Sequence, residues 1–204
     1  MYSLSKPFAI PEHIEAIIFD MDGTLVDSME IHFQAYQYAF APWGITCSWD
    51  HFQKRAGIPA SETFALILQD NGKEDMDIDL DEVGQRKSAY IQEHLHKATL
   101  IEPTAALMKQ FANKLPMSIG TGTRREAADM IVTNLGIDAY IPHVVTADDV
   151  TQYKPAPETF LKCAELMGVA PEKCLVFEDG EMGIVAAQKA GMPVIDVKEY
   201  LVKE

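Results

Sequence analysis

Short, mainly apolar runs, each followed by polar residues, are the feature that most constrains how this chain of 204 residues folds. The first run covers residues 15–19 and ends in the acidic, glycine-containing segment 20–24. Similar runs occupy residues 116–120, 143–146, 174–177 and 193–197. Runs of this length are typical of strands that are buried on both sides of a parallel sheet. Helical apolar patterns separate the runs from about residue 100 onward, which predicts an α/β core with helices on both faces of the sheet.

Residues 29–98 break this alternation, because their apolar spacing is helical and no convincing strand occurs among them. Asp27 is predicted to be the N-cap of the first helix, with Glu30 as its capping-box partner. The expected apolar face of that helix consists of Ile31, Ala35, Tyr38 and Ala39. We therefore expect an all-helical cap, residues 29–98, inserted into a core formed by residues 1–28 and 99–204.

An acidic segment, residues 74–82, contains six carboxylates in nine residues. A calcium cage would need a turn, usually with glycine, that folds its ligands inward, and no glycine lies within this segment. We interpret it as a solvated lead-in whose charges favour the N-terminus of the next helix.

The net charge limits the possible partners. Seventeen Lys and Arg residues against 31 Asp and Glu residues give a formal charge of -14, which disfavours binding to nucleic acid or to an anionic membrane surface. Three cysteines without a CxxC pair indicate a reducing compartment. No segment is typical of a signal peptide or a transmembrane helix, so the chain is predicted to be cytoplasmic.

Polar side chains follow the predicted strands. Asp20 and Asp22 follow the first, Thr121 and Thr123 the second, Glu178 and Asp179 the fourth, and the third leads towards Lys154. The carboxyl ends of parallel strands line one crevice, so these side chains should meet there. Oxygen ligands suit Mg²⁺, and Asp20 and Asp179 are the first candidates.

A calcium loop of the EF-hand type is the alternative for the segment that begins at Asp20. Such a loop requires Gly at its sixth position and Glu at its twelfth. Those positions hold Leu25 and Ile31, so the spacing excludes it.

Four segments together resemble the four motifs of the haloacid-dehalogenase-like superfamily, and in particular its small phosphatases with a helical cap. They are residues 20–27, 119–123, 153–157 and 176–183, and the match covers almost the whole chain. The resemblance implies a Rossmann-like core with an inserted cap, and Mg²⁺-dependent hydrolysis of a small phosphomonoester.

Roles for individual residues follow from this resemblance. Asp20 would be the nucleophile that forms an aspartyl-phosphate, and Asp22 would be the general acid and base. Thr121, Gly122 and Lys154 would bind the phosphoryl group. The implied Mg²⁺ ligands are Asp20, the backbone carbonyl of Asp22, and Asp179, with Glu178 as a further ligand or as an acceptor beside them.

The cap is expected to choose the substrate. His32 matches a histidine found at this place in the sugar-phosphate branch, and Arg124 is a further candidate substrate contact. Where the related beta-phosphoglucomutases carry an Arg for the distal phosphate, this chain has Ala60. That difference favours a phosphatase, and the chain is similar to the bacterial fructose-1-phosphate phosphatase type. The expected partner is a small phosphorylated metabolite, and the expected state a monomer or weak dimer.

Other functions remain as alternatives. A phosphosugar mutase of the beta-phosphoglucomutase type is the nearest one. A true dehalogenase would not need Asp22 or the carboxylates at 178 and 179, and a non-catalytic phosphate-binding regulator would be expected to lose Asp20 or Asp22.

Overall fold

The computed structural model of the chain describes residues 2–203. Its centre is a five-stranded sheet in the order β6-β5-β2-β7-β8, in which every pair of neighbours is parallel. The strands are β2 (Ala16–Phe19), β5 (Met117–Gly120), β6 (His143–Val145), β7 (Cys174–Glu178) and β8 (Val194–Asp196). Each corresponds to one predicted apolar run, so the predicted parallel α/β core is confirmed.

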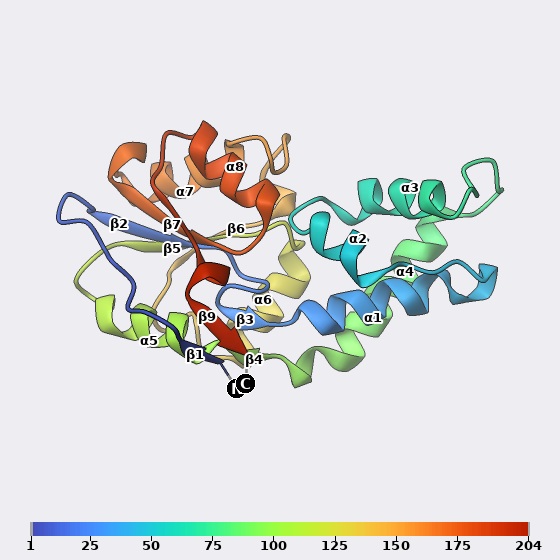
Figure 1. The fold of residues 1–204 in the computed structure, drawn as a ribbon, viewed down its shortest axis with the longest axis horizontal. Helices are drawn as coiled ribbons and strands as arrows, with labels where there is room; N and C mark the ends of the chain where they lie inside the picture. Colours follow the sequence, from blue (N-terminus) through green and yellow to red (C-terminus); the bar gives the residue numbers. More distant parts are fainter. Residues whose placement is uncertain (1, 204) are drawn as a thin grey trace.

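Helices cover both faces of this sheet (Figure 1). They are α5 (Glu102–Phe111), α6 (Arg125–Asn134), α7 (Glu158–Met167) and α8 (Glu181–Lys189). Ile17 and Phe19 of the central strand pack in one apolar cluster with residues of α5 and α6. Ile18, which points to the opposite face, packs with residues of α7 and α8. Burial on both sides explains why β2 is apolar at every position.

The cap consists of α1 (Met29–Phe40), α2 (Trp49–Lys54), α3 (Ala60–Asp70) and α4 (Leu80–His94). It lies beside the core and has an apolar cluster of its own, centred on Tyr36, Phe40, Phe64 and Ile67. Short 3-10 helices complete the structure: η1 (Ala41–Trp43), η2 (Leu95–Lys97), η3 (Ala147–Asp149), η4 (Pro171–Lys173) and η5 (Val197–Glu199). The helical cap is thus confirmed, whereas the division at residues 28/29 and 98/99 stays a prediction.

Two small antiparallel ribbons join the parts of the chain. β3 (Val26–Asp27) pairs with β4 (Thr99–Leu100), so the segments entering and leaving the cap run side by side. β1 (Tyr2–Leu4) pairs with β9 (Leu201–Lys203), which brings the ends of the chain together (Figure 1). The Tyr2 hydroxyl donates to Asp27 Oδ1 at 3.2 Å, and Lys203 Nζ lies 3.2 Å from Asp27 Oδ2. The ends of the chain therefore contact the cap linker.

For α1 the predicted cap is wrong, and the predicted apolar face is confirmed in part. The helix begins at Met29 with Ser28 as N-cap, because Asp27 belongs to β3 and its carboxylate pairs with Lys203. Its predicted partner Glu30 instead accepts a hydrogen bond from Gln34 at 2.8 Å. Tyr38 is 46% exposed, and the buried residues of α1 are His32, Ala35, Tyr36, Ala39 and Phe40. The predicted Ala35 and Ala39 are therefore confirmed as part of the buried face and Ile31 is half-buried, whereas Tyr38 is wrong.

The acidic segment behaves as a helix lead-in. Its Asp79 caps α4 and accepts hydrogen bonds from the backbone N–H groups of Asp81 and Glu82 at 2.9 and 3.3 Å. Asp81 and Glu82 lie in the first turn, where negative charge is favourable. The interpretation as a solvated lead-in to the next helix is confirmed.

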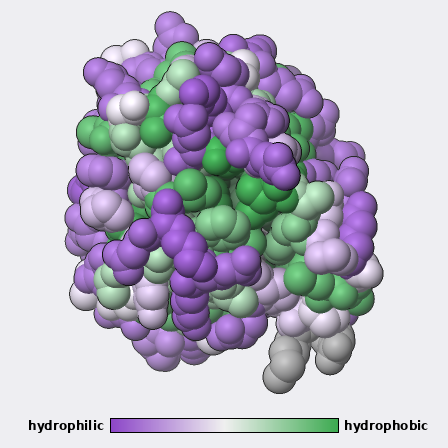
Figure 2. Space-filling model, turned by 90° about the vertical axis from the view of Figure 1, so that its left-hand side faces the viewer, coloured by the Kyte–Doolittle hydropathy of each residue, from purple (hydrophilic) through white to green (hydrophobic). Residues whose placement is uncertain are grey.

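The core surface away from the cap is hydrophilic over most of its area, with apolar side chains gathered near its centre (Figure 2). Within residues 2–203, no helix combines the length and the apolar character needed to span a membrane. The cysteines Cys47, Cys163 and Cys174 are free and buried.

Candidate active site

The carboxyl edge of the sheet gathers the charged residues that the sequence singled out. Asp20 directly follows β2, Glu178 is the last residue of β7, and Asp179 comes next. Lys154 reaches the same point from the loop between β6 and α7. All four are at most 6% exposed, so their charges interact in a medium much less polar than water.

Lys154 lies at the centre of this group. Its Nζ donates to Asp20 Oδ1 and Glu178 Oε2, each at 2.7 Å, and to the carbonyl of Gly120 at 3.1 Å. Burial disfavours the ammonium, but the two carboxylates outweigh it and hold the pKa of Lys154 above its usual value. Lys154 is therefore a fixed positive charge beside Asp20.

The carboxylates of Asp20, Glu178 and Asp179 each offer an oxygen within 4.8 Å of the others. Burial, followed by repulsion from Glu178, raises the pKa of Asp20 well above its usual value and that of Asp179 to about 6. These three carboxylates share the buried space with one buried ammonium, that of Lys154, so negative charge exceeds positive charge here. A buried set of carboxylate oxygens with excess negative charge fits a hard divalent cation such as Mg²⁺.

Glu178 is held on both oxygens. Oε1 accepts from the backbone N–H groups of Asp179 and Gly180 at 3.0 and 2.9 Å, while Oε2 receives Lys154. Gly183 of α8 leaves the space for this carboxylate, since a Cβ there would lie 1.8 Å from Oε2. The side chain thus has a single well-supported position.

Asp179 has two partners that sequence reasoning missed. Thr24 Oγ1 donates to Oδ1 at 3.3 Å, and Lys198 Nζ lies 3.4 Å from Oδ2. Gly23 has a φ of +93°, and a Cβ there would approach Asp179 Oδ2 to 2.6 Å. The signal for Lys198 was its place just after the last predicted strand, at the same sheet edge.

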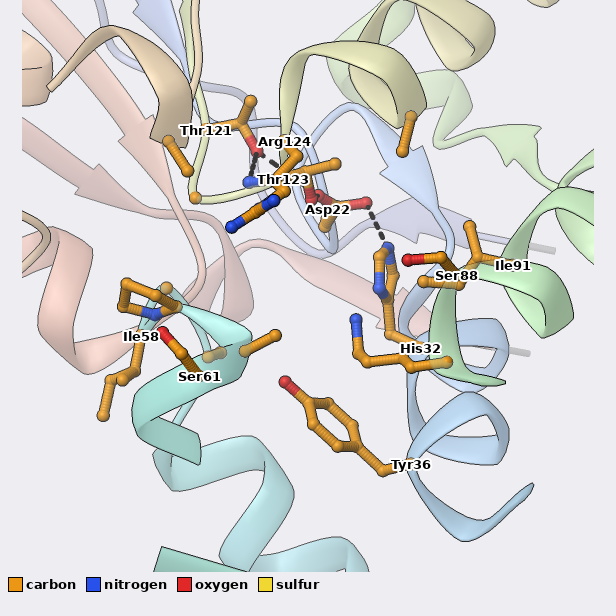
Figure 3. A pocket seen from close by; sticks show the side chains of 18 of the residues that line it. Asp22, His32, Tyr36, Ile58, Ser61, Ser88, Ile91, Thr121, Thr123 and Arg124 are labelled. Atoms are coloured by element: carbon orange, nitrogen blue, oxygen red, sulfur yellow. Dashed lines mark hydrogen bonds and ion pairs between the residues drawn. The ribbon is translucent and has the colours of Figure 1, made fainter. Parts of the chain in front are cut away.

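Asp22 lies nearby in a network of side-chain donors (Figure 3). Ser28 Oγ and Thr123 Oγ1 donate to it at 2.5 and 2.7 Å, Thr121 Oγ1 at 3.3 Å, and His32 Nε2 lies 3.1 Å away. Burial favours the protonated acid, but His32, Ser28 and Thr123 outweigh it and hold the pKa of Asp22 well below its usual range. His32, predicted to contact substrate, thus contacts Asp22.

A cavity of about 630 Å³ opens above these residues, between core and cap. Asp20, Asp22 and Thr121 line it from the core side. Hydroxyl, amide and amino groups of the cap line it from the other side, contributed by Tyr36, Ser61, Gln85, Lys87, Ser88 and Gln92. Figure 3 shows Tyr36, Ser61 and Ser88 among them. The volume suits a small metabolite.

The remaining predicted residues lie at the cavity rim. Gly122 allows the cap loop to approach, because a Cβ there would lie 3.1 Å from the carbonyl oxygen of Gly57. Arg124 lines the cavity, but its side chain is 82% exposed and 3.9 Å from Asp148. Of these two, Gly122 is the one in close contact between core and cap. Arg55, which was not predicted from the sequence, also lines the cavity and is paired with Asp70 through two hydrogen bonds, at 2.7 and 2.9 Å.

Comparison with known proteins agrees with this geometry. Fructose-1-phosphate phosphatase YqaB from Escherichia coli is 34% identical over 187 residues, 92% of this chain and 98% of that protein. A phosphorylated carbohydrates phosphatase from Thermotoga maritima is 30% identical over 88% of this chain and 82% of its own length. The structure of CbbY from Rhodobacter sphaeroides in complex with phosphate has the same fold, with a TM-score of 0.77 at 21% identity, and covers 89% of this chain and 84% of that one. Residues 17–197 match the family of haloacid dehalogenase-like hydrolases, so the chain belongs to that family and is one of its phosphomonoester hydrolases.

Proposed function

We propose that this chain is a Mg²⁺-dependent phosphatase of small phosphorylated sugars, with fructose 1-phosphate as the first candidate substrate. The observation that carries the proposal is the floor of the cavity, where Asp20 bonded to Lys154, the other two carboxylates and the Asp22 network meet. The relatives named above, which act on fructose 1-phosphate and on phosphorylated carbohydrates, support the substrate class.

The reaction proceeds in two displacements at phosphorus. An oxygen of Asp20 bonds to phosphorus while the ester P–O bond breaks, and Asp22 gives its proton to the leaving alcohol. A water molecule then attacks the aspartyl-phosphate, Asp22 takes the proton from that water, and phosphate leaves as the carboxylate of Asp20 is restored. Each step transfers one proton through Asp22, so the residue ends as it began.

The donor network of Asp22 serves the second step. Hydrogen bonds from Ser28, Thr123 and His32 favour the carboxylate, which is the form that accepts a proton from water. A bound phosphate dianion acts in the opposite direction, because its negative charge raises the pKa of a neighbouring acid. Substrate binding therefore favours the protonated Asp22 that the first step needs, and the donor network favours the carboxylate that the second step needs.

Charge repulsion between Asp20 and the phosphate must be offset. Two unit charges about 4 Å apart repel by about 4 kcal/mol at an effective dielectric constant of 20. Lys154 Nζ, already 2.7 Å from Asp20 Oδ1, provides one compensating charge, and Thr121 provides a hydroxyl donor for a phosphoryl oxygen.

Bound Mg²⁺ would supply further neutralisation of the phosphoryl oxygens. Asp20, Asp179 and the backbone carbonyl of Asp22 would hold it. Both oxygens of Glu178 already accept from Lys154 or from backbone N–H groups. This favours Glu178 as the residue that supports the ligands rather than as a ligand itself.

The cap side of the cavity supports a sugar monophosphate. Its hydroxyl and amide groups can hydrogen-bond to a polyol. Arg55 is occupied by Asp70, and Ala60 offers no charge for a second phosphate. A bisphosphorylated intermediate would lack that contact, which favours a phosphatase over a mutase. Arg124 is proposed as a rim contact only.

Phosphate release from a panel of sugar phosphates, with and without Mg²⁺, tests the proposal. We expect hydrolysis that requires Mg²⁺, and loss of turnover in Asp20→Asn. No hydrolysis of any phosphomonoester by the wild type would contradict it. Interconversion of sugar 1- and 6-phosphates with a bisphosphate primer would instead favour the mutase. Cytoplasmic location and a monomeric or weakly dimeric state stay predictions.

A further inference from the structure

Lys198 reaches the carboxylate cluster of Asp20, Glu178 and Asp179 from the segment that follows β8, an edge strand of the sheet. β8 pairs with β7 so that Asp196 lies opposite Glu178, which places the residues after β8 beside Asp179. Val197 is fully buried, and the backbone N–H of Lys198 donates to Asp196 Oδ1 at 2.9 Å. The backbone at Lys198 is therefore anchored, and its side chain extends to Asp179.

The two lysines of the site serve different carboxylates. Lys154 Nζ is hydrogen-bonded to Asp20 and Glu178. Lys198 Nζ lies 3.4 Å from Asp179 Oδ2, and it is the one cation within ion-pair distance of Asp179 among residues 2–203. The charge of Asp179 thus depends on Lys198 while no metal ion is bound.

Exposure also separates the two lysines. The side chain of Lys154 is 2% exposed, whereas that of Lys198 is 50% exposed although its partner Asp179 is only 5% exposed. An ordinary surface pair has two exposed partners, as Lys6 and Glu199 do, at 53% and 67%. Lys198 can therefore withdraw into solvent, while Lys154 cannot.

A divalent cation and an ammonium group compete for the same carboxylate oxygen. Thr24 still holds Oδ1 of Asp179, and Gly23 limits its movement, so Asp179 stays in place without Lys198. We propose that Lys198 is a positioning residue that neutralises Asp179 in the metal-free enzyme and is displaced from Asp179 when Mg²⁺ binds. This competition for Asp179 sets the affinity for the metal. This rests on the proposed function, in which Asp179 is a metal ligand.

Removing the ammonium should therefore tighten Mg²⁺ binding. A half-exposed ion pair contributes a modest free energy, so we expect a dissociation constant about three- to tenfold lower in Lys198→Met. The metal-free variant should also melt at a lower temperature than the wild type, because Asp179 then has no charge partner. Saturating Mg²⁺ should remove that difference.

Isothermal titration calorimetry of the metal-free, full-length protein with MgCl₂, together with melting temperatures in chelator and in Mg²⁺, tests the inference. Lys198→Arg keeps the charge and should bind Mg²⁺ like the wild type. Lys189→Met removes an exposed lysine of α8 and controls for the change in net charge. Lys198→Gln replaces the Met variant if that one does not fold.

Equal or weaker binding by both neutral variants at position 198 would overturn the role of Lys198 and leave the proposed phosphatase intact. Absence of Mg²⁺ binding in the wild type would instead contradict the metal site of the proposed function. The two failures are thus distinguished within one experiment.

Discussion

Replacing Gly183 by Ala tests whether Glu178 has only one position. Glu178 is 3% exposed and is pinned by one ammonium and two backbone N–H groups. A Cβ at position 183 would lie 1.8 Å from its Oε2, 2.2 Å from Cδ and 2.7 Å from Cγ. Because the overlap extends back to Cγ, rotation of the carboxylate group alone does not relieve it.

The expected effect is a large loss of stability. Displacing Glu178 leaves the buried Lys154 without one of its two carboxylates, and disruption of a buried ion pair costs about 3–5 kcal/mol. Ala in a helix gains about 1 kcal/mol over Gly, so the net loss should be about 2–4 kcal/mol. In a protein of this size each kcal/mol lowers the melting temperature by about 2–4 °C, which predicts a decrease of about 4–16 °C.

Thermal and urea unfolding, followed by circular dichroism, measure this loss. Gly84→Ala is the matched control: it also lies inside a helix, and its Cβ would meet only Phe64 at an ordinary 3.8 Å. It should be neutral or stabilise by up to about 1 kcal/mol. In a Glu178→Ala background, Gly183→Ala should become harmless, as a double-mutant cycle would show. A loss below about 1 kcal/mol in the single variant would refute the reasoning.

Three further predictions concern Asp22 and the cavity. Ser28→Ala removes the 2.5 Å hydrogen bond to Asp22 and should lower kcat about 10- to 100-fold. The neighbouring control Asp27→Ala should leave kcat unchanged and alter the free energy of unfolding by less than about 1 kcal/mol. Steady-state kinetics and urea unfolding of both variants test this prediction. Thr123→Val removes a donor that lowers the pKa of Asp22. Hydrolysis of the aspartyl-phosphate needs the Asp22 carboxylate, so the acidic limb of the kcat profile should move to higher pH, and an unmoved limb would count against the network. Burial lowers the pKa of Lys87 to about 8; Asp22 opposes this shift and Arg124 adds to it. Lys87 therefore loses its positive charge above pH 8, and the KM for an anionic substrate should rise there. Lys87→Met should abolish that rise. The folded protein then binds fewer protons at Lys87 than the unfolded chain above pH 8, so this group's contribution to stability increases with pH there.

Strand positions could be predicted because a strand that is buried on both faces is a continuous apolar run in the sequence. β2 is apolar at all four positions, and its end is marked by the change to Asp20. The same rule located Thr121, Glu178 and Asp179, since parallel strands end at a common edge. Lys154 was found through its motif, because the loop that carries it has no pattern of its own.

Side-chain contacts between segments could not be predicted, because they produce no local pattern in the sequence. Ser28 is the N-cap residue of α1, yet its hydroxyl donates to Asp22 rather than to the helix backbone. Asp27 was predicted to be that cap because nothing nearby reveals that Lys203, near the other end of the chain, pairs with it. Tyr38 was wrongly assigned to the apolar face of α1 for a related reason. Tyr36 is buried in the cap cluster and lines the cavity, whereas Tyr38 lies on the exposed side.

The balance of charge at the site explains how an acidic protein can bind an anionic substrate. Against the three carboxylates of the cluster, Lys154 leaves two negative charges in excess. Lys198 neutralises one of them, and a divalent cation that displaces it neutralises both. A monovalent cation in that place would leave one charge facing the phosphate, with a repulsion of about 4 kcal/mol per unit charge at about 4 Å and an effective dielectric constant of 20. This local count supports the proposed Mg²⁺ site, whereas the formal charge of -14 bears only on polyanionic partners.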